Sequence, residues 1–300
     1  MPAELDSLRA QEMLQDRARL RQSRDFAAAD AIRDQLRQGG WEVVDGPDGS
    51  SLQALELPPP ARAVTMLTLL HGWPGDAGRW LSGVVAHSAG HDFEALIVDN
   101  SANAEVKQWL DTAAGERTRV LRVDPPEGWA QAANRGLEAS AGEVVILFDP
   151  GVELTGDVAG SILDALSDPG VAVAGAFGVT AAGRIGHFHS DAGPEVDALE
   201  GYVLAFRRRE ALAVGGFDRK FRYYRLADFE LCYRLRDRLG GRALVVPGLP
   251  VVKHEHRLWE AHGKEERERL SRRNYHRLIE LWGKREDLLR NPHHSPHSKA

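Results

Sequence analysis

Residues 128–154 read GWAQAANRGLEASAGEVVILFDPGVEL, a helix-like segment followed by a short apolar strand that ends in an acidic residue. The run from Val144 to Leu147 is rich in β-branched residues, is too short for a typical helix, and is bounded by Gly142 and Pro150. The pattern therefore predicts a strand with Asp149 at its carboxyl end. Open α/β sheets bind their ligands just outside the carboxyl ends of their strands, so Asp149 is a candidate for a functional site.

Similar apolar segments recur on both sides of this stretch and alternate with segments long enough for crossover helices. This alternation predicts an α/β fold with a mostly parallel sheet flanked by helices. The first two predicted strands end at His71-Gly72 and Asp99-Asn100, polar residues suited to a nucleotide-binding edge, yet neither GxGxxG nor GxxxxGK[ST] follows them. Classical dinucleotide-binding and P-loop proteins are therefore disfavoured. The predicted strands are Thr65–Leu70, Phe93–Val98, Arg119–Val123, Val144–Phe148 and Val171–Ala176.

A small appendage precedes this pattern. Apolar residues at helical spacing predict two helices that end at Gly39-Gly40, and residues 41–44 and 51–55 predict a β-hairpin around Gly46-Pro47-Asp48-Gly49. Three consecutive prolines then stiffen the exit. We expect an appendage of helical hairpin and β-hairpin over residues 1–57, a proline linker over 58–63, a main domain over 64–285 and a disordered tail over 286–300.

Composition and charge limit the class of protein. The 300 residues are 43% hydrophobic and carry a net charge of -6, so we expect a globular chain and no general affinity for nucleic acid. Residues 1–57 contain seven arginines against eleven acidic residues, whereas residues 253–300 have a net charge of +4. The absence of a long apolar run or a signal-peptide pattern predicts a cytoplasmic location. Cys232, the single cysteine, is expected to be a buried thiol in a helix over 229–239.

Three segments taken in order resemble glycosyltransferase family 2. They are LIVDNSAN (96–103), the stretch 128–154, and GYVLAFRRREALAVGGFDRKFRYYRLADFELCYRLRDRLGGRALVVPGLPVVKHEH (201–256). The resemblance covers about residues 64–285 and implies a GT-A-like fold. It also implies transfer of a sugar from a nucleotide-diphosphate donor to a hydroxyl group of a glycan, lipid or small-molecule acceptor.

The resemblance implies roles for particular residues. Asp228 would be the catalytic base of an inverting displacement, and a divalent cation, Mg²⁺ or Mn²⁺, would neutralise the departing diphosphate. The i, i+2 spacing of His254 and His256 sends their imidazoles to opposite faces of an extended segment, so only one is expected to reach the metal. The implied metal ligands are Asp149, His254 and His256, and the implied substrate contacts are Asp99, Asn100, Asn134, Gly201 and Glu230.

Several positions depart from the family pattern. The acidic residue expected two positions after Asp149 is Gly151, and the acidic residue expected before Asp228 is Ala227. Metal dependence is therefore open, and Asp149 and Asp228 taken singly also suit a turn and a helix N-cap. A catalytically silent protein that binds nucleotide sugars is the first alternative function.

The appendage has a resemblance of its own. Residues 17–52 resemble the C-terminal end of cysteinyl-tRNA synthetases, which implies an RNA-facing module and a second alternative, an RNA-associated protein acting through this hairpin. The acidic balance of the appendage argues against an RNA partner, and a docking or oligomerisation hairpin explains it equally well. The C-terminal basic excess leaves peripheral contact with an anionic membrane open.

Overall fold

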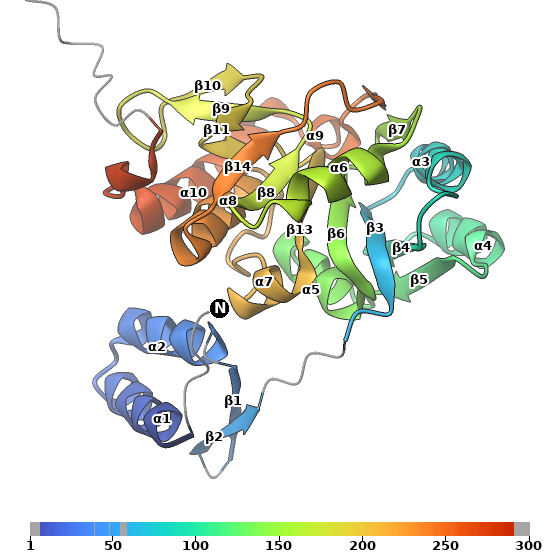
Figure 1. Ribbon diagram of the computed structural model, residues 1–300. Coiled ribbons are helices and arrows are strands. Elements are labelled where there is room, and N and C mark those ends of the chain that lie inside the picture. Colours follow the sequence, from blue (N-terminus) through green and yellow to red (C-terminus); the bar gives the residue numbers. More distant parts are fainter. Residues whose placement is uncertain (1–6, 39, 48, 55–58, 291–300) are drawn as a thin grey trace, which may run out of the picture. The chain divides into compact units, whose positions relative to one another are not determined.

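The computed structural model describes residues 7–38, 40–47, 49–54 and 59–290 (Figure 1). Its contacts divide the chain into two compact units. Met1–Pro59 and Arg209–Gly216 form the first unit, and Pro60–Arg208 and Phe217–Ala300 form the second.

The first unit contains the two helices and the β-hairpin that the sequence predicts. Helices α1 (Ser7–Gln22) and α2 (Phe26–Gln38) are followed by strands β1 (Trp41–Gly46) and β2 (Gly49–Ala54). The strands pair antiparallel with Gly46 opposite Gly49, so the turn falls at the predicted position. Residue 55 of the predicted second strand lies outside the described residues. The buried apolar centre is small and consists of Ala10, Leu36 and Val43.

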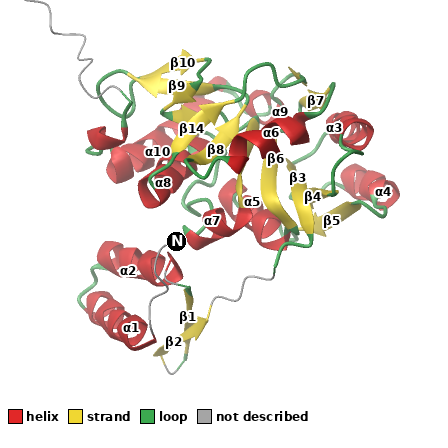
Figure 2. Ribbon diagram, viewed as in Figure 1, coloured by secondary structure: helices red, strands yellow, loops and turns green. Residues whose placement is uncertain are grey.

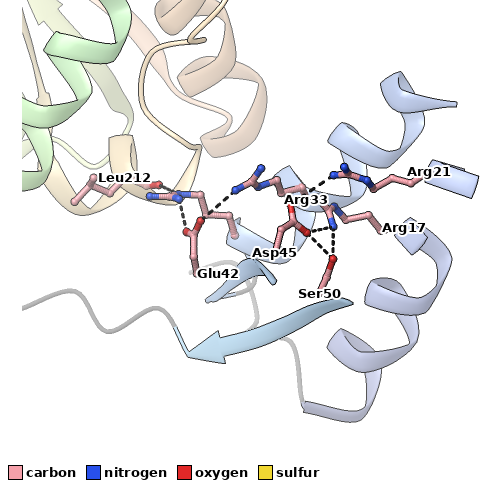
Figure 3. A network of polar contacts seen from close by, with 8 residues as sticks. Arg17, Arg21, Arg33, Glu42, Asp45, Ser50 and Leu212 are labelled. Atoms are coloured by element: carbon pink, nitrogen blue, oxygen red, sulfur yellow. Dashed lines mark hydrogen bonds and ion pairs between the residues drawn. The ribbon is translucent and has the colours of Figure 1, made fainter. Parts of the chain in front are cut away.

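A buried arginine joins the helices of this unit to its hairpin (Figure 3). The Arg17 side chain is 1% exposed, and its two terminal nitrogens donate to the two carboxylate oxygens of Asp45 at 2.9 and 3.0 Å. Arg17 also donates to the Ser50 hydroxyl at 3.0 Å. These bonds hold the pKa of Asp45 well below its usual range. Because removal of Asp45 would leave the buried Arg17 charge without its partner, the pair ties α1 to the hairpin.

The second unit is built on an eight-stranded, mainly parallel sheet with helices on both faces (Figure 2), as the sequence predicts. The strand order is β11-β14-β8-β13-β6-β3-β4-β5. Neighbours β6, β3, β4 and β5 run parallel, as do β14 and β8, whereas β13 runs antiparallel to β6 and β8. The strands are β3 (Arg62–Leu70), β4 (Phe93–Asp99), β5 (Thr118–Arg122), β6 (Gly142–Phe148), β8 (Val171–Gly175), β11 (Glu195–Val196), β13 (Val203–Arg207) and β14 (Arg242–Val245).

Alternate residues of the strands place their side chains in two apolar layers, one on each face of the sheet. Met66 packs in one cluster with buried side chains of α3 (Pro74–His87), α4 (Ala104–Ala113) and α6 (Val158–Ser167). Leu67 points to the other face, where α5 (Trp129–Ala139) approaches closely. A Cβ atom on Gly136 of α5 would lie only 2.8 Å from side-chain atoms of Leu67, so glycine is what permits this approach.

The remaining strands lie outside the main sheet. Strands β9 (Gly178–Ala181), β10 (Phe188–Asp191) and β12 (Ala198–Leu199) form a small antiparallel sheet. Strands β7 (Val152–Leu154) and β15 (Val251–Lys253) form a two-stranded antiparallel ribbon directly after β6. This ribbon returns a distant part of the chain to the carboxyl end of the central strand.

The C-terminal part of the chain is helical. Cys232 is fully buried in α8, as expected, and burial raises the pKa of its thiol to about 12. No helix within the described ranges is long and apolar enough to cross a membrane. The helices are α7 (Arg208–Ala213), α8 (Ala227–Leu239), α9 (Arg257–Glu260), α10 (Lys264–Trp282) and the 3-10 helix η1 (Glu286–Leu288).

One sequence expectation about this part is wrong. Residues 286–290 do not belong to a disordered tail, because they contain η1, the Leu289 side chain is buried, and Arg290 N donates to the buried carboxylate of Asp197 at 2.9 Å. Long-range contacts order this segment although its local sequence is polar. The rest of the predicted tail, residues 291–300, lies outside the described residues.

Candidate active site

A cavity of about 420 Å³ opens at the carboxyl end of β6, where the sequence predicts a ligand site. Apolar side chains from β3 and β6 form its floor, and polar side chains come from the segment before β13, the start of α8 and the end of β15. Its polar lining consists of Trp129, Asp149, Glu200, Gly201, Tyr202, Tyr224, Arg225, Asp228, Lys253 and His256.

Asp149 is placed by the end of the central strand. Its backbone N–H donates to Tyr202 O at 3.1 Å, and its Oδ1 accepts from Gly151 N at 2.8 Å. The ribbon β7–β15 then brings back the segment that contains His256, whose Nε2 lies 3.4 Å from Asp149 Oδ2. Two residues more than a hundred positions apart in sequence therefore meet at one edge of the cavity.

The His256 imidazole is held by its surroundings. Its ring lies 4.4 Å from the ring of Tyr224. Burial lowers the pKa of His256, although the nearby Asp149 carboxylate acts in the opposite direction, and the lowered pKa favours the neutral imidazole. Its Nδ1 is buried and has no hydrogen-bond partner among the described residues. A neutral imidazole is the form that binds a metal ion.

Asp228 also lines the cavity, from the first turn of α8. The preceding Leu226 has a φ of 64°, a left-handed conformation that is costly for a branched side chain and that concentrates at functional sites. The Asp228 carboxylate accepts two backbone hydrogen bonds, from Gly201 N at 2.7 Å and Phe229 N at 2.9 Å. The carboxylate is therefore fixed against the segment that precedes β13.

Burial raises the pKa of the Asp228 carboxyl to about 6, and the nearby Glu200 adds to this effect. The two backbone N–H groups favour the ionised form, but they do not offset the loss of water around the charge. A carboxylate whose pKa lies close to neutrality is suited to act as a general base.

The residues present supply only some of the ligands that a divalent cation needs. Within the described residues, no group of three or more His, Cys, Asp and Glu side chains is arranged to bind a metal. Asp149 Oδ2 and His256 Nε2 are 3.4 Å apart, close to the separation of about 3 Å between adjacent ligands of an octahedral ion. Mg²⁺-type ions in proteins often take one or two carboxylates and complete their shell with substrate phosphates and water. The pair fits such an open site.

Two expected substrate contacts lie outside this cavity, at the end of the neighbouring strand β4. The buried Asp99 accepts from the backbone N–H of Ser101 at 3.1 Å and from its hydroxyl at 2.6 Å. The Asn100 side chain exchanges two hydrogen bonds with the backbone of Glu127, at 2.8 and 2.9 Å. Both residues lie on the same sheet edge as Asp149 but do not line the cavity.

Three further candidates have other partners. The Asn134 side chain exchanges hydrogen bonds of 2.8 Å with the backbone of Phe217. Glu230 is 1% exposed and pairs with Arg234. His254 Nε2 lies 2.8 Å from Glu153 Oε2, away from Asp149. The structure thus brings Asp149, Gly201, Asp228 and His256 together, and does not bring Asn134, Glu230 or His254 to them.

Several residues that line the cavity are not predicted by any sequence pattern. Lys253 Nζ lies 3.5 Å from Glu200 Oε2 and 4.2 Å from the centroid of the Tyr202 ring. Arg225 lies beside them with its guanidinium over the ring of Trp259, at 4.8 Å. The only available signal is proximity in sequence, because Lys253 immediately precedes the His254-Glu255-His256 segment and Arg225 lies three residues before Asp228.

A known family model matches half of this chain. The model of the family described as glycosyl transferase family 2 matches residues 79–231, just over half of the chain. The matched range begins in α3 and ends within α8, so it contains Asp149 and Asp228. Lys253 and His256 lie beyond it.

A solved structure shares its fold with most of this chain. The structure of GalNAc-T7 with UDP, GalNAc and Mn²⁺ superposes with a TM-score of 0.59 at 17% identity, covering 75% of this chain and 48% of that one. The mannosyltransferase PcManGT from Pyrobaculum calidifontis, in complex with GDP-Man and Mn²⁺, gives 0.49 at 17% identity, covering 64% of this chain and 57% of that one. The chain therefore spans about half the length of these proteins, and its fold is that of GT-A glycosyltransferases.

The appendage matches a different protein. A cysteine–tRNA ligase from Rhodospirillum rubrum is 49% identical over 43 residues, which are 14% of this chain and 9% of the ligase. The match is short, and it agrees with the resemblance that the sequence of residues 17–52 shows.

Proposed function

Because the chain belongs to glycosyl transferase family 2, we propose that it transfers a sugar from a nucleoside-diphosphate donor to a hydroxyl group of an acceptor, with inversion at the reacting carbon. The observation that carries this proposal is the cavity itself. The cavity is lined by the Asp228 carboxylate, whose pKa is raised, and by Asp149 and His256, whose side chains lie 3.4 Å apart.

Asp228 acts as the general base in this proposal. Its carboxylate removes the proton of the acceptor hydroxyl, and the oxygen attacks the donor sugar as the bond from that sugar to the diphosphate breaks. The electron pair of the broken bond leaves with the diphosphate. The backbone N–H groups of Gly201 and Phe229 keep the carboxylate oriented while it receives the proton. A single displacement of this kind inverts the configuration of the sugar.

Asp149 and His256 would hold a Mn²⁺ or Mg²⁺ ion in this proposal. GalNAc-T7, which has the same fold, contains Mn²⁺ together with UDP and GalNAc. When bound, such an ion neutralises negative charge on the departing diphosphate. With one carboxylate and one imidazole, the free protein would bind the ion weakly, so ion and nucleotide are expected to bind together.

The test is a titration with UDP, GDP, dTDP and CDP, each with and without Mn²⁺ or Mg²⁺, followed by calorimetry and thermal unfolding. A ligand at about 100 times its Kd stabilises the folded protein by about 2.7 kcal/mol, which is readily measured. We expect one nucleotide to bind best, and binding to weaken in Asp149→Ala but not in the control Asp164→Ala, which lies on the exposed side of α6. Failure of all four nucleotides to bind would rule the proposal out.

Gly151 favours a second candidate function, a protein that binds nucleotide sugars without transferring them. The missing carboxylate at this position weakens the metal site. The two candidates differ in turnover: the enzyme transfers or hydrolyses the donor and loses this activity in Asp228→Asn. A silent binder shows equal donor binding and no turnover in both proteins.

A further inference from the structure

Lys253 lies where the ribbon β7–β15 meets the cavity. In the antiparallel register Lys253 is opposite Val152, and the next residue, His254, donates its backbone N–H to Gly151 O at 2.9 Å. Lys253 is thus directly beside position 151, and its side chain lines the cavity that contains Asp149 and Asp228.

Position 151 itself has no room for an acidic side chain. A Cβ atom built on Gly151 would lie 2.9 Å from the backbone oxygen of Glu255 and 3.0 Å from Asp149 Oδ1. The first of these contacts is with the backbone two residues after β15, which cannot move aside as a flexible side chain can. The chain segment that follows β15 therefore requires glycine at position 151, so this position contributes no carboxylate beside Asp149, and the Lys253 ammonium group lies next to it.

The ion pair between Lys253 and Glu200 is weak. The pair with Glu200 is 3.5 Å long, and the two side chains are 46% and 33% exposed. Such an ion pair contributes little to stability. The ammonium group is a compact charge on a flexible stem with three donors, and a phosphate oxygen is a stronger acceptor for it than a solvated carboxylate at this distance.

We propose that Lys253 binds the diphosphate of the donor nucleotide, taking over part of the charge neutralisation that the incomplete metal site leaves undone. The inference rests on the proposed function, since it concerns the same donor. On binding, the ammonium group exchanges Glu200 for a phosphate oxygen, so Glu200 competes with the donor. Diphosphate binding then has a component that does not need a metal ion.

The experiment measures the Kd of the nucleoside diphosphate that binds best and of the matching nucleoside monophosphate, in EDTA and in Mn²⁺. Lys253→Met is compared with Lys253→Arg, which keeps the charge, and with Lys264→Met, which removes an exposed lysine at the start of α10 outside the cavity. In EDTA, Lys253→Met is expected to weaken diphosphate binding by about 10- to 100-fold, the effect of one charge-assisted hydrogen bond. Monophosphate binding should change by less than about threefold, since the lost contact is to the second phosphate.

Glu200→Gln supplies an independent variant whose effect has the opposite sign. It frees Lys253 from its competitor, so diphosphate binding is expected to strengthen by about threefold, and this gain should be absent when Lys253→Met is combined with it. Thermal unfolding without ligand checks that each variant is folded.

The outcomes separate the inference from the proposed function. If the wild-type protein binds a nucleoside diphosphate but Lys253→Met binds it equally well, or loses monophosphate binding to the same extent, the inference is overturned and the proposed function stands. Wild-type binding that disappears completely in EDTA also overturns it. If the wild-type protein binds none of the nucleotides in any condition, the proposed function is itself overturned.

Discussion

A carboxylate lies at each end of the central sheet, Glu94 at the amino end and Asp228 of α8 beside the carboxyl end, and the two have different surroundings. At the amino end, Glu94 is 4% exposed and accepts hydrogen bonds from the Thr65 hydroxyl at 2.7 Å, Ala141 N at 2.5 Å and the Arg119 guanidinium at 2.7 Å. At the carboxyl end, Asp228 accepts only from backbone N–H groups, and within the described residues no cation lies in ion-pair contact with it.

We propose that this difference separates a structural carboxylate, Glu94, from a reactive one, Asp228. Glu94 neutralises a positive charge and satisfies three donors, so it stabilises the edge where β3, β4 and β6 begin. Asp228 faces a cavity, and burial raises its pKa to about 6, although the charge of Arg225 acts in the opposite direction. An ionisable group whose pKa is strongly shifted and which lies beside a cavity is often a functional group. Substitutions at the two ends of the sheet can therefore test the contrast.

The largest effect is expected from Asp228→Asn. The amide keeps the size of the side chain but cannot accept a proton, so sugar transfer should fall by about 100- to 10,000-fold. Nucleotide binding, measured by calorimetry, should stay within about threefold of the wild-type value because the change spares Asp149 and His256. A variant that keeps more than about a tenth of the activity would show that another group is the base.

Glu94→Ala should lower the stability of the protein and leave its activity nearly unchanged. Removing the carboxylate leaves the buried Thr65 hydroxyl and the Ala141 N–H without their acceptor, so the free energy of unfolding should fall by about 2–4 kcal/mol in a urea titration. The activity of the folded fraction should remain within about threefold of wild type, because Glu94 lies at the far end of the sheet. Unchanged stability together with lost activity would reverse the roles that we assign to the two carboxylates.

The pH dependence of the reaction should follow Asp228. The base must be ionised, so kcat/KM should fall about tenfold for each pH unit below a pKa of about 6 and level off above it. The contribution of Asp228 to the free energy of unfolding changes with pH in the opposite direction. Since the pKa of Asp228 is raised on folding, its contribution to stability is complete below about pH 4 and is lost as the pH rises through about 6. A rate that is flat between about pH 5 and 8 would contradict the assignment, whereas Glu94→Ala should keep the wild-type midpoint.

The sequence predicts the sheet and the position of Asp149 at its edge, because these follow from local patterns, whereas the role of Asp228 is implied only by the resemblance to the family. The run from Val144 to Leu147 forms a strand, and the residue that ends it must lie at the sheet edge. Lys253 and Glu200 are not predicted because they reach the cavity through the register of the ribbon and the path into β13, which local patterns do not encode.

Glu230 shows where resemblance alone misleads. Asp228 and Glu230 are two residues apart on α8, about 200° around the helix axis, so both side chains cannot face one cavity. Glu230 instead pairs with Arg234 and accepts from the Trp282 indole at 3.3 Å. Helical spacing alone is therefore enough to exclude Glu230 from a site that contains Asp228.

The smallest effect that we predict concerns the support of Asp228. A Cβ atom on Gly201 would lie 3.0 Å from Asp228 Oδ2 and 3.1 Å from its Cβ, so Gly201→Ala must push the carboxylate aside by a few tenths of an ångström. A displacement of this size should lower the rate of transfer by about three- to tenfold, because catalysis depends steeply on the position of the base. Nucleotide binding should not change.

Gly90→Ala is the matched control for this variant, since a Cβ atom at Gly90 meets no other atom within 4 Å. If both alanine variants transfer sugar at the wild-type rate, the contact with Gly201 does not set the position of Asp228. The carboxylate would then differ from Glu94 in its charge environment alone. If only Gly201→Ala is slow, the position of the Asp228 carboxylate is tightly fixed although no side chain bonds to it. Backbone N–H groups would then orient Asp228 in the way that Thr65 and Arg119 orient Glu94.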